Sequence, residues 1–298
     1  MKNVKKLSNK EPTKDISRDD LKSKIPLSTS KKKRIVKISK NLSFGGDKLP
    51  IIAGPNGVES EKLMINIAKQ LKKNDIHIIR GHAYKPLTFP YRSKQYSESR
   101  DKGMDIMDEI KKDFGLLVVT EVTELRFLER INKTADILQI GSRNMQNLEL
   151  IKKIASTQKP IILKRHFGSS IRDLLGAAEH ILLEGNSNLI LCERGMSIPH
   201  THRSTSRFAL DIQAIPALKE ISCLPVISDP SHASFWAPWV PSLTYASIAA
   251  GCDGLIIEIH PNPKKSFVDP LQPLNFNQFK KLITKSKKIS ILFNKKII

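Results

Sequence analysis

Short apolar runs alternate with longer amphipathic segments along most of the chain. Each run spans only four or five residues and is apolar almost throughout, which is typical of a strand buried on both faces. We predict eight such strands, at residues 49–53, 76–79, 116–120, 137–140, 160–163, 189–192, 224–228 and 254–257. The segments between them mostly show helical periodicity. We predict helices at 59–73, 101–113, 148–155, 171–183, 211–221 and 241–250.

This alternation predicts an α/β protein. Strands separated by helices pair in parallel, and eight strand–helix units over about 250 residues are typical of a (β/α)8 TIM barrel. An open, doubly wound sheet would alternate in the same way, but no G-x-G-x-x-G motif follows any predicted strand. We therefore predict a single barrel domain.

Positive charge is concentrated at the two ends of the chain. The net charge is +21 at pH 7, and residues 1–40 hold 14 Lys and Arg against four Asp and Glu. This segment lacks core periodicity, so we predict that residues 1–45 form a basic, disordered tail and that residues 46–298 form the barrel. Deleting residues 1–40 is then expected to leave activity intact. Aromatic residues that could stack on bases are scarce, so nucleic-acid binding is not expected to be the main role.

Neither a membrane span nor an export signal is indicated. The sequence has no run of 18 apolar residues and no apolar segment near its start. Cys192, Cys223 and Cys252 lie far apart in apolar segments, which is typical of buried, reduced thiols. We expect a cytoplasmic protein with no membrane partner.

Charged and polar residues follow most of the predicted strands. In a barrel the carboxyl ends of all strands face one cavity, so these side chains are expected to meet. They are Asn56, Arg80, Lys85, Glu121, Arg143, Lys164, Arg165, Arg194, His232 and Glu258. Any single Arg could form a rim salt bridge of little consequence. Six cations at the same end instead predict a site for a multiply charged anion, such as a phosphate with a carboxylate.

Eight short motifs occur along the barrel segment: GPNGVES (54–60), RGHAYKP (80–86), TEV (120–122), ILQIGSRNMQN (137–147), KPIILKR (159–165), LILCERG (189–195), DPSHA (229–233) and IIEIHPNP (256–263). In this order they resemble the 3-deoxy-arabino-heptulosonate 7-phosphate (DAHP) synthases. The similarity is to the short-barrel branch that also contains 3-deoxy-manno-octulosonate 8-phosphate synthase. It runs from about residue 50 to residue 282, and IGSRNMQN and CERG are especially specific.

The resemblance implies a carbon–carbon bond-forming transferase of the shikimate pathway of aromatic amino acid biosynthesis. Its substrates would be phosphoenolpyruvate and an aldose, with erythrose 4-phosphate as the default, and the enzyme would be a homo-oligomer (dimer or tetramer). The residues implied to hold phosphoenolpyruvate are all present: Arg80, Lys85, Ser142, Arg143, Lys164 and Arg207. The residues implied to act in catalysis are Lys85, Glu121 and His232, and those implied to contact the second substrate are Pro86 and Thr88.

The chain departs from the family at the first strand end. Metal-dependent members carry a Cys where this chain has Asn56, while His232, Glu258 and Asp269 match the other three metal ligands. An amide is a far weaker ligand than a thiolate, and metal-independent octulosonate synthases also carry Asn here. The resemblance therefore implies a divalent metal that is weakly bound or dispensable.

A second departure concerns the aldehyde. DAHP synthases usually read KPRTSPY where this chain reads KPLTFPY, so Leu87 replaces the Arg that binds the phosphate of erythrose 4-phosphate. Three alternatives to the default therefore stay open. One is a diverged paralogue with a different aldehyde, which need not be phosphorylated, and another is an octulosonate synthase. The third is a non-catalytic, basic binding protein on the same barrel.

Overall fold

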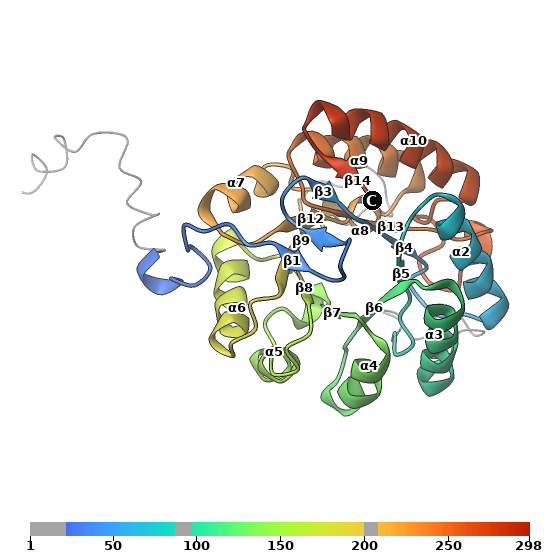
Figure 1. The fold of residues 1–298 in the computed structure, drawn as a ribbon, viewed down its shortest axis with the longest axis horizontal. Helices are drawn as coiled ribbons and strands as arrows, with labels where there is room; N and C mark the ends of the chain where they lie inside the picture. The colour runs from blue at the N-terminus through green and yellow to red at the C-terminus, as the bar shows by residue number, and fades with distance from the viewer. Residues whose placement is uncertain (1–21, 87–96, 200–207) are drawn as a thin grey trace, which may run out of the picture.

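Eight parallel strands close into a barrel, and each strand pairs with the next around the ring (Figure 1). The computed structural model describes residues 22–86, 97–199 and 208–298. The strands are β4 (Ile51–Gly54), β5 (Ile78–Arg80), β6 (Leu117–Glu121), β7 (Ile137–Ile140), β8 (Ile161–Lys164), β9 (Leu189–Glu193), β12 (Val226–Ser228) and β13 (Leu255–Glu258). Pairing of β13 with β4 closes the ring. The predicted (β/α)8 fold is confirmed.

Helices cover the outside of the barrel (Figure 1). They are α2 (Glu61–Lys73), α3 (Arg100–Phe114), α4 (Leu128–Thr134), α5 (Leu148–Ala155), α6 (Ile171–Leu183), α7 (Ala214–Ile221), α9 (Val240–Ala249) and α10 (Phe276–Leu292). Several begin at side chains that accept hydrogen bonds from their first turn, and Ser170 and Asn275 each form a full capping box. Across the described part of the chain, no helix has both the length and the apolar character needed to cross a membrane.

Short elements occupy the loops at the carboxyl ends of the strands. They are η1 (Leu125–Phe127), η2 (Ser142–Asn144), β10 (Met196–Ser197), β11 (Phe208–Ala209), α8 (Pro230–Ser234), η3 (Ala237–Trp239) and η4 (Pro263–Lys265). The sequence pattern did not predict them, and it also missed α4 and α10. The loop elements and α4 are two to seven residues long, so none of them is long enough to show a clear period.

The first predicted strand, at 49–53, is divided in the structure. Barrel strand β4 begins at Ile51, whereas Lys48–Leu49 forms β3 and pairs with Lys296–Ile297 (β14) at the end of the chain. Pro50 stands between the two strands and has no N–H to donate, which suits a boundary between two pairing partners.

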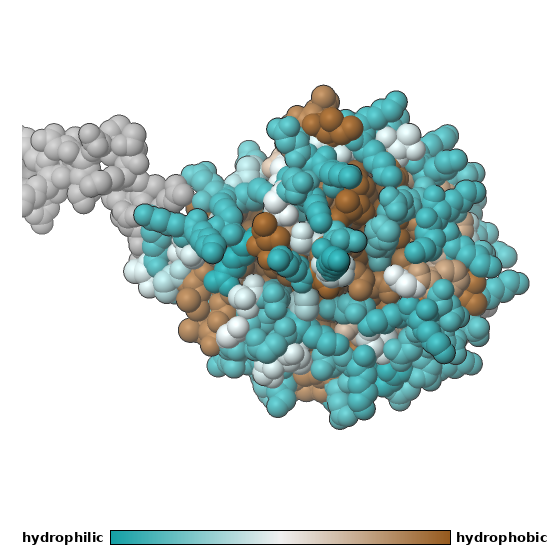
Figure 2. Space-filling model, viewed as in Figure 1, coloured by the Kyte–Doolittle hydropathy of each residue, from teal (hydrophilic) through white to brown (hydrophobic). Residues whose placement is uncertain are grey.

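A hairpin closes the amino-terminal end of the barrel. Its strands are β1 (Val36–Lys37) and β2 (Ser43–Phe44), and in Figure 1 it lies across the ring. Val36, Leu42 and Phe44 are buried and pack with inward-facing residues of the barrel strands, such as Ile52 and Ile256. The hairpin therefore acts as a plug. Around it, the same face of the molecule is mostly hydrophilic (Figure 2).

This hairpin corrects the predicted boundary of the tail. Residues 1–21 lie outside the described part of the chain, but residues 25–45 belong to the folded domain. Glu179 of α6 accepts hydrogen bonds from the backbone N–H groups of Leu27 and Ser28, each at 2.8 Å. The strands of this segment are only two residues each, which is too short to show a clear period. They are buried because the open end of the barrel needs a cover.

We predict that Phe44→Ala lowers the free energy of unfolding by about 3–5 kcal/mol, because the buried ring would leave a cavity under the barrel. The neighbouring Ile35 is 56% exposed, so Ile35→Ala is the matched control and should change stability by less than about 0.5 kcal/mol. Urea denaturation measures both variants. Equal stabilities for the two variants would show that Phe44 does not pack inside the barrel. The prediction that residues 1–45 form a dispensable tail would then stand.

Candidate active site at the barrel mouth

The candidate site is built from the last residue of several barrel strands. Arg80 ends β5, Glu121 ends β6, Lys164 ends β8 and Glu258 ends β13. All four side chains are buried. A charge removed from water is costly unless it is paired and hydrogen-bonded, so the partners of these groups determine what the site can bind.

Arg80 and Glu258 form an ion pair in which both side chains are fully buried. Arg80 Nη2 lies 3.0 Å from Glu258 Oε2, and Arg80 Nε donates to the carbonyl oxygen of Pro55 at 3.3 Å. Gln272 also donates to Glu258 Oε2. Burial raises the pKa of Glu258 to about 7 despite the opposing charge of Arg80. Arg80 Nη1 has no hydrogen-bond acceptor among the described residues, so one donor of this buried guanidinium remains available.

Lys85 and Glu121 form a second pair, with Lys85 Nζ 2.7 Å from Glu121 Oε2. Gln139 Nε2 donates to the same oxygen at 3.4 Å, and His82 Nε2 lies 4.0 Å from it. Burial by itself would raise the pKa of Glu121, but the nearby charge of Lys85 outweighs it and holds this pKa well below its usual range. Glu121 is therefore a carboxylate at neutral pH.

His82 fixes the backbone at the end of β6. Its Nδ1 accepts a hydrogen bond from the Glu121 backbone N–H at 2.9 Å, which leaves the proton of the neutral ring on Nε2. Burial lowers the pKa of His82 well below its usual value, so the ring is neutral. His82 was not expected to belong to the site, although it lies within the RGHAYKP motif.

A third group links Lys164, Asp229 and His232. Lys164 Nζ is paired with Asp229 Oδ2, and His232 Nδ1 lies 2.8 Å from the same oxygen. The other oxygen of Asp229 caps α8 by accepting from the His232 backbone N–H at 3.0 Å. Burial lowers the pKa of His232 to about 3 even though Asp229 opposes the shift, so this ring is also neutral at pH 7. Asp229 follows β12 and was not expected to be a site residue.

Two of the cations expected at the mouth have other partners. Arg165 Nη1 lies 2.9 Å from both Glu193 Oε2 and Asp211 Oδ2, and Arg165 Nε donates to the Ser169 carbonyl. The Arg194 guanidinium stacks 4.3 Å from the ring centre of Phe208. Asp229 and Glu193, which were not among the expected site residues, therefore balance the charges of Lys164 and Arg165.

Ser142 and Arg143 lie on η2, directly after β7. Arg143 is exposed, and no described residue forms a hydrogen bond or ion pair with its side chain. Pro86 is exposed at the end of the described segment that also carries Lys85. Arg207, Leu87 and Thr88 lie outside the described residues, so the aldehyde side of the expected site is described only at Pro86.

The four residues expected to hold a metal all contact other protein groups. Asn56 Nδ2 donates to Asp269 Oδ2 at 3.1 Å, and His232 Nε2 lies 3.8 Å from Glu258 Oε2. No group of three or more His, Cys, Asp and Glu in the described residues has the geometry of a metal site. Two buried oxygens, Asn56 Oδ1 and Glu258 Oε1, have no donor among the described residues. This set fits a weakly held hard cation with water ligands better than a tightly held soft one.

The sequence matches the model of the DAHP synthetase I family over residues 26–294. It is 39% identical over 250 residues to a phospho-2-dehydro-3-deoxyheptonate aldolase from Thermotoga maritima, covering 84% of this chain and 72% of that protein. It is 28% identical over 235 residues to a 2-dehydro-3-deoxyphosphooctonate aldolase from Methylococcus capsulatus, covering 74% of this chain and 81% of that one.

Solved structures agree with the sequence matches. The crystal structure of the phospho-2-dehydro-3-deoxyheptonate aldolase (DAHP synthase) from Thermotoga maritima superposes with a TM-score of 0.84 at 36% identity, covering 90% of this chain and 76% of that one. A truncated form of the Thermotoga maritima synthase gives a TM-score of 0.83 at 34% identity, covering 92% and 100%. The similarity therefore includes the whole barrel.

The Glu121 carboxylate packs directly against Gly141. A Cβ atom at position 141 would overlap Glu121 Oε1. We predict that Gly141→Ala lowers the free energy of unfolding by about 1–3 kcal/mol, because the buried carboxylate must move away from Lys85 and Gln139. Gly176 in α6 has open space around it. The control Gly176→Ala should instead raise stability by about 0.5–1 kcal/mol. A stabilised Gly141→Ala protein in chemical denaturation would show that Glu121 is not held at this position.

Proposed function

The chain belongs to the DAHP synthetase I family, and from that premise we propose that it condenses phosphoenolpyruvate with an aldose and releases phosphate. Erythrose 4-phosphate is the default aldose, and the product is a 3-deoxy-2-ketoaldonate. The observation that carries the proposal is the cluster of Arg80, Lys85 and Lys164 at the barrel mouth, where the buried Arg80 Nη1 has no acceptor among the residues that the structure describes.

Phosphoenolpyruvate carries up to three negative charges, which must be screened before its C3 can attack a carbonyl carbon. We propose that Arg80, Lys85, Ser142, Arg143 and Lys164 bind it, and that Arg207 completes the set. Lys164 and Arg80 are held in place by Asp229 and Glu258. These cations therefore have little conformational freedom to lose when the ligand binds.

The Lys85–Glu121 pair supplies an acid and a base to the reaction. When C3 bonds to the aldehyde carbon, the aldehyde oxygen takes a proton from the Lys85 ammonium, and C2 acquires cationic character. Water adds at C2 and loses a proton to the Glu121 carboxylate. Breakage of the bond between C2 and the bridging oxygen then releases phosphate, which takes the proton of the C2 hydroxyl as C2 becomes a ketone. Because Lys85 Nζ lies 2.7 Å from Glu121 Oε2, the proton can return to Lys85 for the next turnover.

His232 provides a neutral hydrogen-bond acceptor, because burial lowers its pKa too far for it to act as a strong base. Its Nδ1 lies 2.8 Å from Asp229 Oδ2, so we place the ring proton on Nδ1 and the lone pair on Nε2. This nitrogen lies 3.8 Å from Glu258 Oε2, and we assign it to water or to the hydroxyl groups of the aldehyde.

A divalent metal would be held by Asn56, His232, Glu258 and Asp269, and it would polarise the aldehyde oxygen. The hydrogen bond from Asn56 to Asp269 supports a weak or dispensable ion, because the amide takes the place of an anionic ligand.

The identity of the aldehyde is the open part of this function. Leu87 replaces the Arg that DAHP synthases use for the aldehyde phosphate, which supports a paralogue with a different, unphosphorylated aldehyde. The similarity to an octulosonate-forming relative supports the other alternative from the same class. We further propose that the enzyme is cytoplasmic, acts in the shikimate pathway and assembles as a homo-oligomer. A panel of aldoses, with phosphate release as the readout, would identify the second substrate.

Arg143 gives the sharpest test of the anion site. Its exposed side chain has no partner among the described residues. We predict that Arg143→Gln weakens phosphoenolpyruvate binding at least about tenfold, the loss of one charge-assisted contact, without changing the stability of the fold. Calorimetry measures the affinity. Lys152→Gln on the outside of α5 removes the same charge and serves as the control. Equal affinities for the two variants would overturn the assignment of phosphoenolpyruvate to this site.

Metal dependence is tested by chelation and by restoring the missing ligand. We predict that the purified protein holds no stoichiometric metal and that chelation lowers turnover only partly. Asn56→Cys should then tighten metal binding, because it adds the thiolate that the family uses. Elemental analysis and competition with a metal-sensitive dye measure binding independently of activity. A stoichiometric metal in the unaltered protein would contradict the prediction, and no tightening in Asn56→Cys would place position 56 away from the ion.

A further inference from the structure

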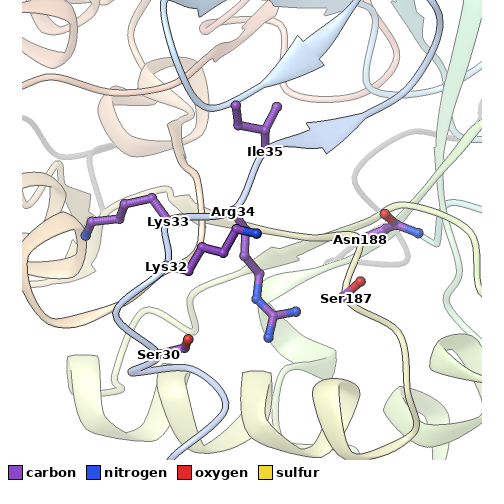
Figure 3. Close-up of a pocket in the computed structure, with 7 residues that line it drawn as sticks. All are labelled: Ser30, Lys32, Lys33, Arg34, Ile35, Ser187 and Asn188. Atoms are coloured by element: carbon purple, nitrogen blue, oxygen red, sulfur yellow. The ribbon is translucent and has the colours of Figure 1, made fainter.

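A basic cavity lies at the amino-terminal end of the barrel, away from the site described above (Figure 3). Its volume is about 330 Å³, which is within the range of about 300–1,000 Å³ seen for small-molecule sites. It is lined chiefly by Ser30, Lys32, Lys33, Arg34, Ser187 and Asn188. Asn188 precedes the first residue of β9, and the Arg34 backbone N–H donates to the carbonyl oxygen of Cys223, ahead of β12. The cavity is therefore at the start of the strands.

One wall is the segment 30–35, which bends at Lys31 and Lys32. Figure 3 shows the Arg34 guanidinium pointing between Ser30 and Ser187, while Lys33 points away. Lys32 also lines the cavity. Lys33 Nζ donates to the carbonyl oxygen of Ser222 at 2.8 Å and also to that of Lys219, at the end of α7. This contact and the hydrogen bond of the Arg34 backbone hold the segment on the barrel.

The opposite wall is equally fixed. Asn186 is fully buried, donates to the Lys159 carbonyl at 2.8 Å and accepts from the Asn188 backbone N–H at 2.9 Å. The Asn188 carbonyl accepts from the backbone N–H of Ile161 in β8 at 2.8 Å. Because both walls are tied to the barrel, the cavity exists before any ligand binds, and little ordering is required on binding.

The charges around the cavity are all of one sign. Among its lining residues there is no carboxylate. Lys32 and Arg34 form no side-chain hydrogen bond or ion pair with any described residue, and Arg34 is half-buried. Elsewhere on the same end of the barrel, Lys219 and Lys295 both pair with Asp253, at 2.6 and 2.8 Å. The cavity therefore concentrates positive charge that the protein itself does not neutralise.

We propose that this cavity is a binding site for a small phosphomonoester. The Arg34 fork and the Lys32 ammonium match the dianionic phosphate group, since guanidinium binds phosphate oxygens in pairs. The hydroxyl groups of Ser30 and Ser187 are uncharged, so they suit the polar remainder of such a molecule. The proposal does not depend on the activity at the barrel mouth.

The test follows each site separately in the full chain. Glycerol 3-phosphate is titrated at constant ionic strength while amide NMR signals are recorded for Ser187 and Asn188 at the cavity. The amide signal of Arg143 reports on the barrel mouth. We expect saturable shifts at Ser187 and Asn188, and we expect Arg34→Gln to raise their midpoint at least about tenfold. Arg34→Gln keeps the backbone hydrogen bond of Arg34, and an unchanged melting temperature verifies its fold.

Lys31 belongs to the same basic run but does not line the cavity, so Lys31→Gln is the matched control and should leave the midpoint unchanged. If Arg34→Gln and Lys31→Gln changed the midpoint equally, the shifts would reflect general surface charge and not a specific site, and the proposal would be overturned. Absence of shifts at Ser187 and Asn188 would overturn it as well, whatever happens at Arg143. Malonate is a dianion without a phosphate group. If it bound as tightly as glycerol 3-phosphate, the cavity would not recognise phosphate, and the proposal would be wrong. A short single-stranded oligonucleotide that displaces the phosphomonoester at lower concentration would assign the site to nucleic acid instead.

Discussion

Buried charge at the carboxyl end of the barrel is the constraint on which the site depends. Arg80, Lys164 and Arg165 are removed from water, and each has a carboxylate within ion-pair distance. Removing one partner of such a pair would leave an uncompensated charge, which is far more costly than the pair itself is stabilising. The ion pairs therefore hold these cations in place. The N–H groups that are left unpaired can donate hydrogen bonds to an anionic ligand.

The barrel makes these pairs possible by bringing strand ends together. Lys164 ends β8, whereas its partner Asp229 follows β12, and Glu258 of β13 meets Arg80 of β5 across β4. Glycine allows the closest of these approaches. Gly141 leaves room for the Glu121 carboxylate, and Gly54 has a φ of 153°, with a Cβ at that position overlapping the Arg80 carbonyl. The chemistry at the mouth is thus tied to the packing of the backbone beneath it.

The opposite end of the barrel has a different role. There the β1–β2 hairpin contributes Val36 and Phe44 to the inner core, and the segment before it forms one wall of the basic cavity. A single stretch of chain, residues 27–44, therefore both closes the barrel and presents unneutralised positive charge. Arg80, Lys85, Lys164 and Arg165 at the mouth are paired with carboxylates, while Lys32 and Arg34 have no such partner among the described residues.

The sequence by itself determined the barrel and most of its mouth. Eight apolar runs gave eight strands because burial on both faces leaves a strong local pattern, and Arg80, Glu121, Lys164 and Glu258 were located because they end those strands. Only the tertiary structure decided which residues form ion pairs and hydrogen bonds with these strand-end side chains. Pairs such as Lys164–Asp229 join residues 65 positions apart, and His82 meets Glu121 through its backbone, so neither leaves a periodic signal. The plug was missed for the same reason: Val36 and Phe44 are buried by the open end of a barrel formed by the residues that follow them.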